Sequence, residues 1–196
     1  MSLVNRISQH FTDSAEIKLN LRDELAPQIA AATQMMLDCL TNDGKILVCG
    51  NGGSAADAQH FAAELVNRFE IERPGLAAIA LTTDTSVLTS IANDYHYDQI
   101  FARQVQALGM SGDVLIAIST SGNSASVVEA VHAAHQRGMR VFALTGREGG
   151  AMAGMMKPGD INLCVGAKST ARIQEVHILA LHCLCDAIDY SLLGDE

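Results

Sequence analysis

Apolar residues follow two patterns along the chain, a helical spacing near both ends and short unbroken runs in between. The helical spacing at the start predicts an amphipathic helix from roughly Leu3 to Leu25. Pro27 then stands where a helix start tolerates it, so a second helix is expected to run to about Leu40. Since a single parallel sheet does not require two leading helices, we expect both to pack against a neighbouring subunit as well as against their own sheet.

Five short apolar runs predict strands, and helical patterns separate them. The expected strands are Lys45–Cys49, Leu76–Leu81, Val114–Ile118, Arg140–Leu144 and Ile161–Val165. The expected helices are Ala55–Arg68, Thr85–Ala92, Asp98–Leu108, a segment after Ser124, and about Thr170 to Leu193. This alternation predicts a three-layer α/β/α sandwich with a five-stranded parallel sheet, in the strand order 2-1-3-4-5. Residues 1–196 should form one domain, with 1–43 as the leading helices and 44–196 as the doubly wound core.

The third run is the most apolar, and a turn rich in hydroxyl groups follows it directly. Its hydroxyls are Ser119, Thr120, Ser121 and Ser124, just before the next helical pattern begins. Such a turn offers hydroxyls, free backbone N–H groups and the positive end of a helix dipole, which suits a phosphate. Simple helix capping is the alternative, but it needs one hydroxyl rather than four. Phosphate binding is therefore the favoured interpretation.

A glycine-rich loop, Gly50–Ser54, follows the first strand. Doubly wound sheets bind ligands where the strand order reverses, between strands one and three. Because the two loops leave those strands at their carboxyl ends, we expect them to line one crevice. The glycine run alone is a weak dinucleotide signal, since it lacks the GxGxxG spacing. Ser54 and Asp57 resemble a capping box, which predicts the start of the next helix.

Composition limits the classes of partner. The chain is 48% hydrophobic and 18% charged, which fits a compact domain with an ample core. Its formal net charge of −9, without a basic run, argues against a nucleic-acid partner. We find neither a signal-peptide pattern nor a long uncharged apolar segment, so a cytoplasmic location and no membrane partner are expected. The five scattered cysteines are expected to be buried, reduced thiols.

Two of the expected helices carry candidate chemical groups. His60 and Glu64 lie four residues apart, so both project from one helix face beside the glycine-rich loop. On spacing alone, a solvated surface pair explains them equally well. Gln174 and His182 share a stripe of the last helix, in surroundings so apolar that a histidine needs a partner. A lone buried histidine is more often a satisfied core residue than a ligand, and only the association with Gln174 and Glu64 singles out His182.

Four segments carry a resemblance: CGNGGSAADAQHFAAEL, TSIANDY, AISTSGNSASVVEA and ARIQEVHILALHCL. Together they resemble the phosphoheptose isomerases, which belong to the sugar isomerase (SIS) family of phosphosugar domains, and the similarity spans nearly the whole chain. It implies a flavodoxin-like SIS fold and a cytoplasmic homotetramer with one zinc ion per subunit. The implied reaction converts sedoheptulose 7-phosphate, a phosphorylated seven-carbon sugar, to D-glycero-D-manno-heptose 7-phosphate. That is the first step of ADP-heptose synthesis, toward the heptose of lipopolysaccharide.

The resemblance also implies the residues of the site. The substrate contacts are Asn51, Gly52, Gly53, Glu64, Asn93, Asp94, Ser119, Thr120, Ser121, Ser124 and Gln174. The metal ligands are His60, Glu64, Gln174 and His182, of which Glu64 and His182 are also the acid–base pair. Family members often carry an acidic residue where this chain has Ala171, so one polar contact near the sugar is missing here.

The residues suit an aldose–ketose isomerase. Such an enzyme needs a base at the reacting carbon, a group that shuttles the hydroxyl proton, and a charge that stabilises the enediolate. Glu64 fits the first role, His182 the second, and zinc the third as a Lewis acid. Because a fully ligated Glu or His cannot also move protons freely, we expect Gln174 to be the weak ligand and Glu64 or His182 to loosen when sugar binds.

The alternative is a non-catalytic SIS scaffold that binds a protein partner. One relative of the family, a replication-initiator-associating protein, keeps the SIS core but lacks the glutamate and the second histidine. This chain has both, as Glu64 and His182. The pair therefore favours the enzyme, without excluding a second role in protein binding.

Overall fold

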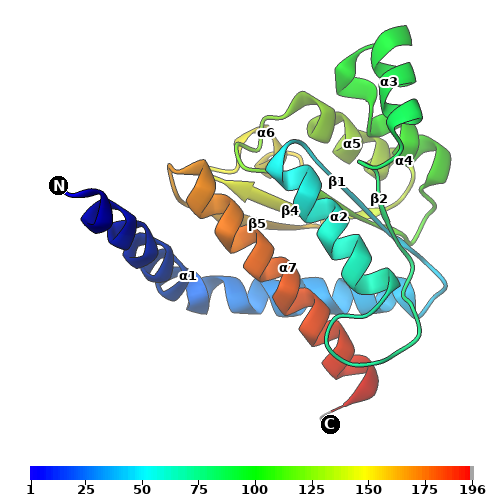
Figure 1. The fold of residues 1–196 in the computed structure, drawn as a ribbon. Coiled ribbons are helices and arrows are strands. Elements are labelled where there is room, and N and C mark those ends of the chain that lie inside the picture. The colour runs from blue at the N-terminus through cyan, green and yellow to red at the C-terminus, as the bar shows by residue number, and fades with distance from the viewer. Residues whose placement is uncertain (195–196) are drawn as a thin grey trace.

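A five-stranded parallel sheet forms the centre of the computed structural model, which describes residues 1–194 (Figure 1). Its strands are β1 (Ile46–Gly50), β2 (Ala78–Ala80), β3 (Val114–Ser119), β4 (Arg140–Gly146) and β5 (Ile161–Val165). They lie in the order β2-β1-β3-β4-β5, and every neighbouring pair is parallel. The predicted strand order is confirmed, although β2 is shorter than its apolar run.

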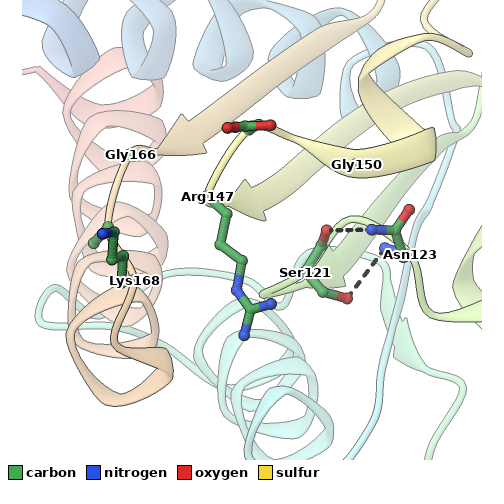
Figure 2. Close-up of a pocket in the computed structure, with 8 residues that line it drawn as sticks. Ser121, Asn123, Arg147, Gly150, Gly166 and Lys168 are labelled. Carbon is green, nitrogen blue, oxygen red and sulfur yellow. Dashed lines mark hydrogen bonds between the residues drawn. The ribbon is translucent and has the colours of Figure 1, made fainter.

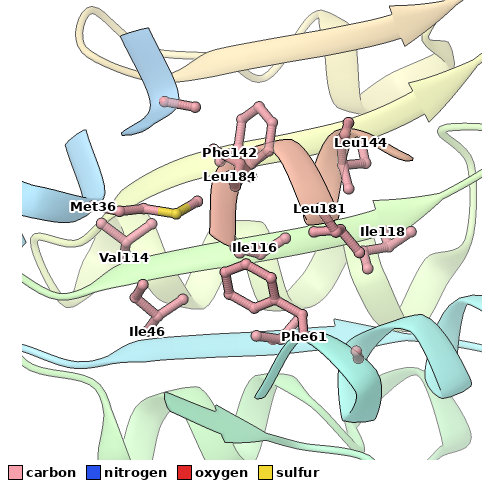
Figure 3. Close-up of a cluster of buried hydrophobic side chains, with 14 of the residues drawn as sticks. Met36, Ile46, Phe61, Val114, Ile116, Ile118, Phe142, Leu144, Leu181 and Leu184 are labelled. Atoms are coloured by element: carbon pink, nitrogen blue, oxygen red, sulfur yellow. The ribbon is translucent and has the colours of Figure 1, made fainter. Parts of the chain in front are cut away.

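Helices cover both faces of the sheet. They are α1 (Leu3–Leu40), α2 (Gly53–Val66), α3 (Thr85–Asp94), α4 (Ala102–Leu108), α5 (Ala125–Gln136), α6 (Gly150–Ala153) and α7 (Thr170–Leu193), with a 3-10 turn η1 (Tyr97–Gln99) before α4. One cluster of buried side chains joins α1, α2 and α7 to the sheet, and a second joins α3, α4 and α5 to it. Ile116 belongs to the first cluster and Leu115 to the second, because successive strand residues point to opposite faces. Figure 3 shows the first cluster, with Phe61 from α2 and Leu184 from α7 near the strands.

The two predicted leading helices are one continuous helix, α1, with Pro27 inside it. Sequence reasoning placed a boundary there because proline lacks a backbone N–H and its ring clashes with the carbonyl four residues earlier. A bend absorbs this conflict without ending the helix, and Figure 1 shows α1 changing direction along its length. Its second half packs on the sheet through residues such as Met36. The first half projects from the body and leaves Leu3 and Phe11 exposed.

The last helix, α7, is buried against its own chain. A stripe with Leu181, Leu184 and Ile188 lies in the same cluster as residues of α1 and α2. By length and composition, α7 is also apolar enough to cross a membrane, which sequence reasoning did not expect. Burial accounts for part of that composition, because 44% of the apolar window is buried inside the protein and a core helix needs such residues. Leu179 and Leu192, in contrast, are exposed.

All five cysteines are free thiols, but the prediction that all are buried is wrong. Cys49 and Cys185 are buried, and burial raises the pKa of each thiol to about 12. Cys183 is exposed and Cys164 is partly exposed. The apolar neighbours of these two residues in the sequence did not reveal which side of a helix or strand each would occupy.

Candidate active site

The glycine-rich and hydroxyl-rich loops meet at the carboxyl ends of β1 and β3, around a pocket of about 350 Å³. Its lining residues are Asn51, Gly52, Gly53, Ser54, Ile118, Ser119, Thr120, Ser121, Ser124, Thr170 and Gln174. We call this the phosphate pocket. The structure brings every expected contact residue of the two loops into it, together with Gln174 from α7.

Three helices begin at the phosphate pocket without a side-chain cap. Their N-cap residues are Gly52 for α2, Ser124 for α5 and Ser169 for α7, and none makes a capping bond through its side chain. The predicted capping box is wrong, because Ser54 lies inside α2. Uncapped N-termini leave backbone N–H groups and the positive end of each dipole to a ligand. Since Ser124 makes no cap bond, simple capping does not explain the hydroxyl-rich turn.

Asn51 ties the two loops together. Its amide nitrogen donates hydrogen bonds to Ser124 Oγ at 2.8 Å and to Ser126 Oγ at 2.9 Å. Its amide oxygen accepts one from the Tyr97 hydroxyl at 3.0 Å. The Asn51 side chain therefore lines the pocket and also holds the two loops in place relative to each other. Sequence reasoning missed Ser126 and Tyr97 because only the folded chain brings them to Asn51.

Two glycines allow close backbone approach at the pocket. A Cβ atom on Gly53 would lie 2.6 Å from Gln174 Nε2, which would push the amide away. Gly122 has a φ of +66°, and a Cβ there would lie 1.9 Å from the carbonyl oxygen of Gly149. A larger residue at either position would distort the pocket.

A second group of side chains, His60, Glu64 and His182, lies between α2 and α7. We call it the histidine cluster. His60 Nε2 is 3.0 Å from Glu64 Oε1 and 3.1 Å from His182 Nε2. Phe69 stacks on the His182 ring, with the two ring centroids 5.8 Å apart. His182 lies 122 positions after His60 in the sequence. The interpretation of His60 and Glu64 as a solvated surface pair does not explain why His182 joins them.

The spacing within the histidine cluster suits a shared metal ion. In a tetrahedral zinc site with bonds of about 2.0–2.1 Å, neighbouring ligand atoms lie about 3.3 Å apart. The separations around His60 Nε2, 3.0 and 3.1 Å, are close to this value. Imidazole and carboxylate groups are also common zinc ligands. Residues 1–194 contain no group of three His, Cys, Asp or Glu side chains already closed around one point, so metal binding would require small side-chain movements.

Gln174, the fourth expected ligand, lies apart from the histidine cluster. Eight residues separate it from His182, about 12 Å along a helix. Its amide rests against Gly53 in the phosphate pocket. For Gln174 and His182 to hold the same metal ion, the Gln174 side chain would have to turn away from Gly53.

Asp57 adds a further carboxyl group to this region. It lies one turn before His60 on α2, and its Oδ2 atom has no hydrogen-bond partner within the described chain. Burial raises the pKa of the Asp57 carboxyl, while the nearby His60 and His182 act in the opposite direction. Sequence reasoning treated Asp57 only as a capping residue, although its spacing from His60 places both on one helix face.

A larger cavity of about 650 Å³ adjoins the phosphate pocket, and Ser121 lines both (Figure 2). Arg147 and Lys168 also line this cavity, whereas no lysine or arginine lines the phosphate pocket itself. Arg147 has a φ of 62°, a strained value for a residue with a side chain. Both cations lie in loops after β4 and β5, where no sequence pattern marked them.

Asn93 and Asp94 lie at the end of α3, outside the lining of the phosphate pocket. Both are exposed, and Asn93 Nδ2 donates a hydrogen bond to Asp94 Oδ1 at 2.9 Å. The turn η1 follows them, and its Tyr97 reaches Asn51. The end of α3 thus borders the crevice, and contact of these two residues with substrate stays a prediction.

Known proteins match both the sequence and the fold. The SIS domain family model matches residues 9–146. Over 196 residues, the chain is 66% identical to the phosphoheptose isomerase of Aromatoleum aromaticum, which covers 100% of this chain and 99% of that protein. The chain belongs to the phosphoheptose isomerase family. The family resemblance found in four sequence segments is therefore confirmed over the full length.

Two solved structures of phosphoheptose isomerases share the fold. The one from Neisseria gonorrhoeae has a TM-score of 0.91 and 56% identity, with coverage of 96% of this chain and 99% of that chain. The one from Francisella tularensis has a TM-score of 0.94 and 48% identity, with the same coverage. The protein is an isomerase enzyme with the SIS fold.

Proposed function

We propose that the protein converts sedoheptulose 7-phosphate to D-glycero-D-manno-heptose 7-phosphate through an enediolate, as the first step of ADP-heptose synthesis. One observation carries the proposal. The histidine cluster places Glu64, an acid–base group, next to His60, and His60 next to His182, on two of the three helices that begin at the phosphate pocket. A sugar phosphate held by its phosphate group would then present its reacting carbons toward these side chains.

The phosphate pocket supports the binding half of this function. Its hydroxyls and three uncapped helix N-termini can neutralise a phosphate without a lysine or arginine. The proposed substrate contacts are Asn51, Gly52, Gly53, Glu64, Asn93, Asp94, Ser119, Thr120, Ser121, Ser124 and Gln174. Because the hydroxyl contacts to the phosphate hold substrate and transition state about equally, their loss should mainly raise KM.

Glu64 and His182 support the chemical half. We assign to Glu64 the removal of the C1 proton of the ketose and its delivery to C2. We assign to His182 the transfer of the proton between the two oxygens. Their mutual neighbour His60 keeps the two side chains within reach of one substrate, and general acid–base groups each contribute about 10²–10⁴-fold to a rate.

A zinc ion is the proposed cofactor, one per subunit, with His60, Glu64, Gln174 and His182 as its ligands. Bound there, zinc would act as a Lewis acid on the substrate carbonyl. The close approach of His60 to Glu64 and His182 supports these three residues as ligands. Gln174 is the weak ligand in this proposal, because its amide must leave Gly53 to reach the metal.

We also propose that the protein is a cytoplasmic homotetramer, in which the first half of α1 packs on other subunits. Support comes from the large apolar side chains of this half that are exposed in the single subunit. They are Leu3, Val4, Ile7, Phe11 and Leu19. Residues 1–43 would then serve assembly as well as the core, and residues 44–196 would carry the doubly wound domain.

Incubation with sedoheptulose 7-phosphate in heavy water tests the function. The expected result is the aldose product with deuterium at C2, followed by NMR, because the base exchanges its proton with solvent. No product at enzyme concentrations that suffice for a known phosphoheptose isomerase would contradict the proposal. In that case, the isomerase would act on a different phosphorylated sugar.

A further inference from the structure

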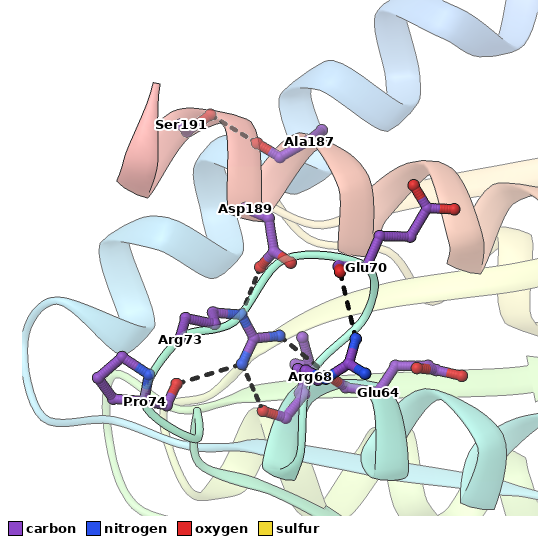
Figure 4. A network of polar contacts seen from close by, with 9 residues as sticks. Glu64, Arg68, Glu70, Arg73, Pro74, Ala187, Asp189 and Ser191 are labelled. Carbon is purple, nitrogen blue, oxygen red and sulfur yellow. Dashed lines mark hydrogen bonds and ion pairs between the residues drawn. The ribbon is translucent and has the colours of Figure 1, made fainter. Parts of the chain in front are cut away.

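A buried arginine connects the two helices of the histidine cluster. Arg73 lies in the loop between α2 and β2 and is only 8% exposed, while its partner Asp189 on α7 is 3% exposed. Arg73 Nε donates to Asp189 Oδ1 at 2.5 Å. Figure 4 shows the arginine between the end of α2 and the side chain of Asp189.

The other nitrogens of Arg73 hold the last turn of α2. Nη2 donates to the backbone carbonyl of Glu64 at 3.0 Å, and Nη1 donates to that of Leu65 at 2.9 Å. Nη1 also donates to the carbonyl of Pro74, in the loop, at 3.2 Å. Carbonyls in the last turn of a helix lack partners within the helix, and a cation there also suits the helix dipole. Arg73 therefore fixes the backbone of Glu64 itself.

The arrangement connects the two proposed acid–base residues through a short series of contacts. Asp189 lies seven residues, or two turns, after His182, so both project from the same side of α7. Arg73 joins Asp189 to the Glu64 backbone. We infer that Arg73 and Asp189 are positioning residues, which set the distance between α2 and α7 and thereby align Glu64, His60 and His182 for metal binding and proton transfer.

Stability alone is a weak reason for this ion pair. Removing two charges from water costs about as much as their attraction returns, and apolar replacement of a buried pair is often neutral or stabilising. A planar guanidinium, in contrast, can hold one carboxylate and three carbonyls at fixed angles, which an ammonium group cannot. The geometry of the pair is thus suited to alignment, and a displacement of about 1 Å at reacting groups can cost 10²-fold in rate.

The test compares two double variants of the full-length protein. Arg73→Met with Asp189→Leu removes the pair, and Lys45→Met with Asp113→Asn removes a 2.6 Å ion pair between the start of β1 and the start of β3, away from the site. We expect the first variant to stay folded by circular dichroism, to lose at least tenfold in kcat with KM within threefold, and to bind Co²⁺ at least tenfold more weakly by absorbance titration. The control should keep kcat and Co²⁺ affinity within twofold.

Unchanged kcat and Co²⁺ affinity in the folded Arg73/Asp189 variant would overturn the inference. If that variant does not fold, Arg73→Lys decides the matter, because it keeps the charge but offers three donors on one nitrogen to the four acceptors of Arg73. It should show the same loss of kcat and of Co²⁺ affinity, and wild-type values for both would overturn the inference. The inference rests on the proposed function, but the two can be tested separately, because Co²⁺ affinity is measured without substrate. If the wild-type protein binds Co²⁺ but does not convert the sugar, only the proposed function is refuted.

Discussion

The phosphate pocket and the histidine cluster lie on the same two helices, yet they are built in different ways. The pocket uses backbone N–H groups, hydroxyls and an amide, most of them from loops at the ends of β1 and β3. The cluster uses ionisable side chains from the middle of α2 and α7, which only tertiary packing brings together. The difference suggests a division of labour. In the proposed function, fixed neutral dipoles bind the unreactive phosphate, and groups that can gain or lose a proton act on the reacting carbons.

The largest expected effect is a fall in kcat when a residue of the histidine cluster is replaced. Glu64→Gln and His182→Gln should each lower kcat by about 10²–10⁴-fold while the protein stays folded, because each variant removes one proton-transfer group. KM should change far less than kcat, since the phosphate pocket is intact. Steady-state kinetics with sedoheptulose 7-phosphate measures both. Activity within a few-fold of wild type in either variant would refute the catalytic assignment.

Helix α7 carries two histidines in different surroundings: His182 belongs to the histidine cluster, and His177 belongs to the buried core. His177 is fully buried, and its Nε2 lies 2.8 Å from the carbonyl oxygen of Thr145. Burial lowers the pKa of His177 from 6.5 to about 4, and the bond to Thr145 opposes this only partly. Between those two pH values the unfolded chain binds a proton that the folded chain does not. The free energy of unfolding should therefore fall by about 3 kcal/mol as pH drops from 6.5 to 4.

Urea denaturation at several pH values measures this slope. His177→Gln should reduce the slope over that range, whereas His10→Gln, at an exposed position of α1, should keep it. An equal slope in wild type and His177→Gln would show that other groups govern the acid stability.

A smaller effect is expected from the pocket itself. Ser121→Ala should raise KM roughly tenfold, as expected for the loss of a hydrogen bond to a charged group, with kcat near wild type. Ser191→Ala is the matched control, because the Ser191 hydroxyl bonds only to its own helix, at Ala187. A fall in kcat at constant KM would instead place Ser121 beside the reacting carbons. Ser124→Ala should act in the same direction, but it also removes an acceptor of Asn51.

The smallest effect concerns the cations at the rim of the pocket. The protein has a net charge of −9, but two cations, Arg147 and Lys168, and one carboxylate, Glu148, line the cavity next to the pocket. We expect the two cations to attract an incoming phosphate. Arg147→Gln and Lys168→Gln should each lower kcat/KM by a few-fold at low salt, and the difference from wild type should shrink at about 0.5 M salt through screening. Equal kcat/KM values at low salt would show that the cations do not steer the substrate.

The same contrast explains what sequence reasoning could find. The pocket was predictable because its loops follow apolar strands, and the doubly wound topology brings the ends of β1 and β3 together. The cluster needed a family resemblance, since nothing in the spacing of His60 and Glu64 points to His182. Contacts such as Arg73 with Asp189 join residues 116 positions apart and left no local pattern.

Local rules also failed where a bend or a neighbouring loop offered another solution. Pro27 predicted a helix boundary, but the bend in α1 accommodates it. Ser54 predicted a cap, but Gly52 begins α2 with a φ of +57°, which glycine adopts without strain. In both places the tertiary structure decided between arrangements that the local sequence allowed.

The most direct test of the division of labour is the rate of deuterium incorporation at C2 of the product, in heavy water and at saturating substrate, for Glu64→Gln and Ser121→Ala side by side. The account predicts the wild-type rate for Ser121→Ala, because saturation overcomes weaker phosphate binding, and a loss of at least 10²-fold for Glu64→Gln. Incorporation by Glu64→Gln at the wild-type rate would contradict the account, as would a loss by Ser121→Ala that saturating substrate does not restore.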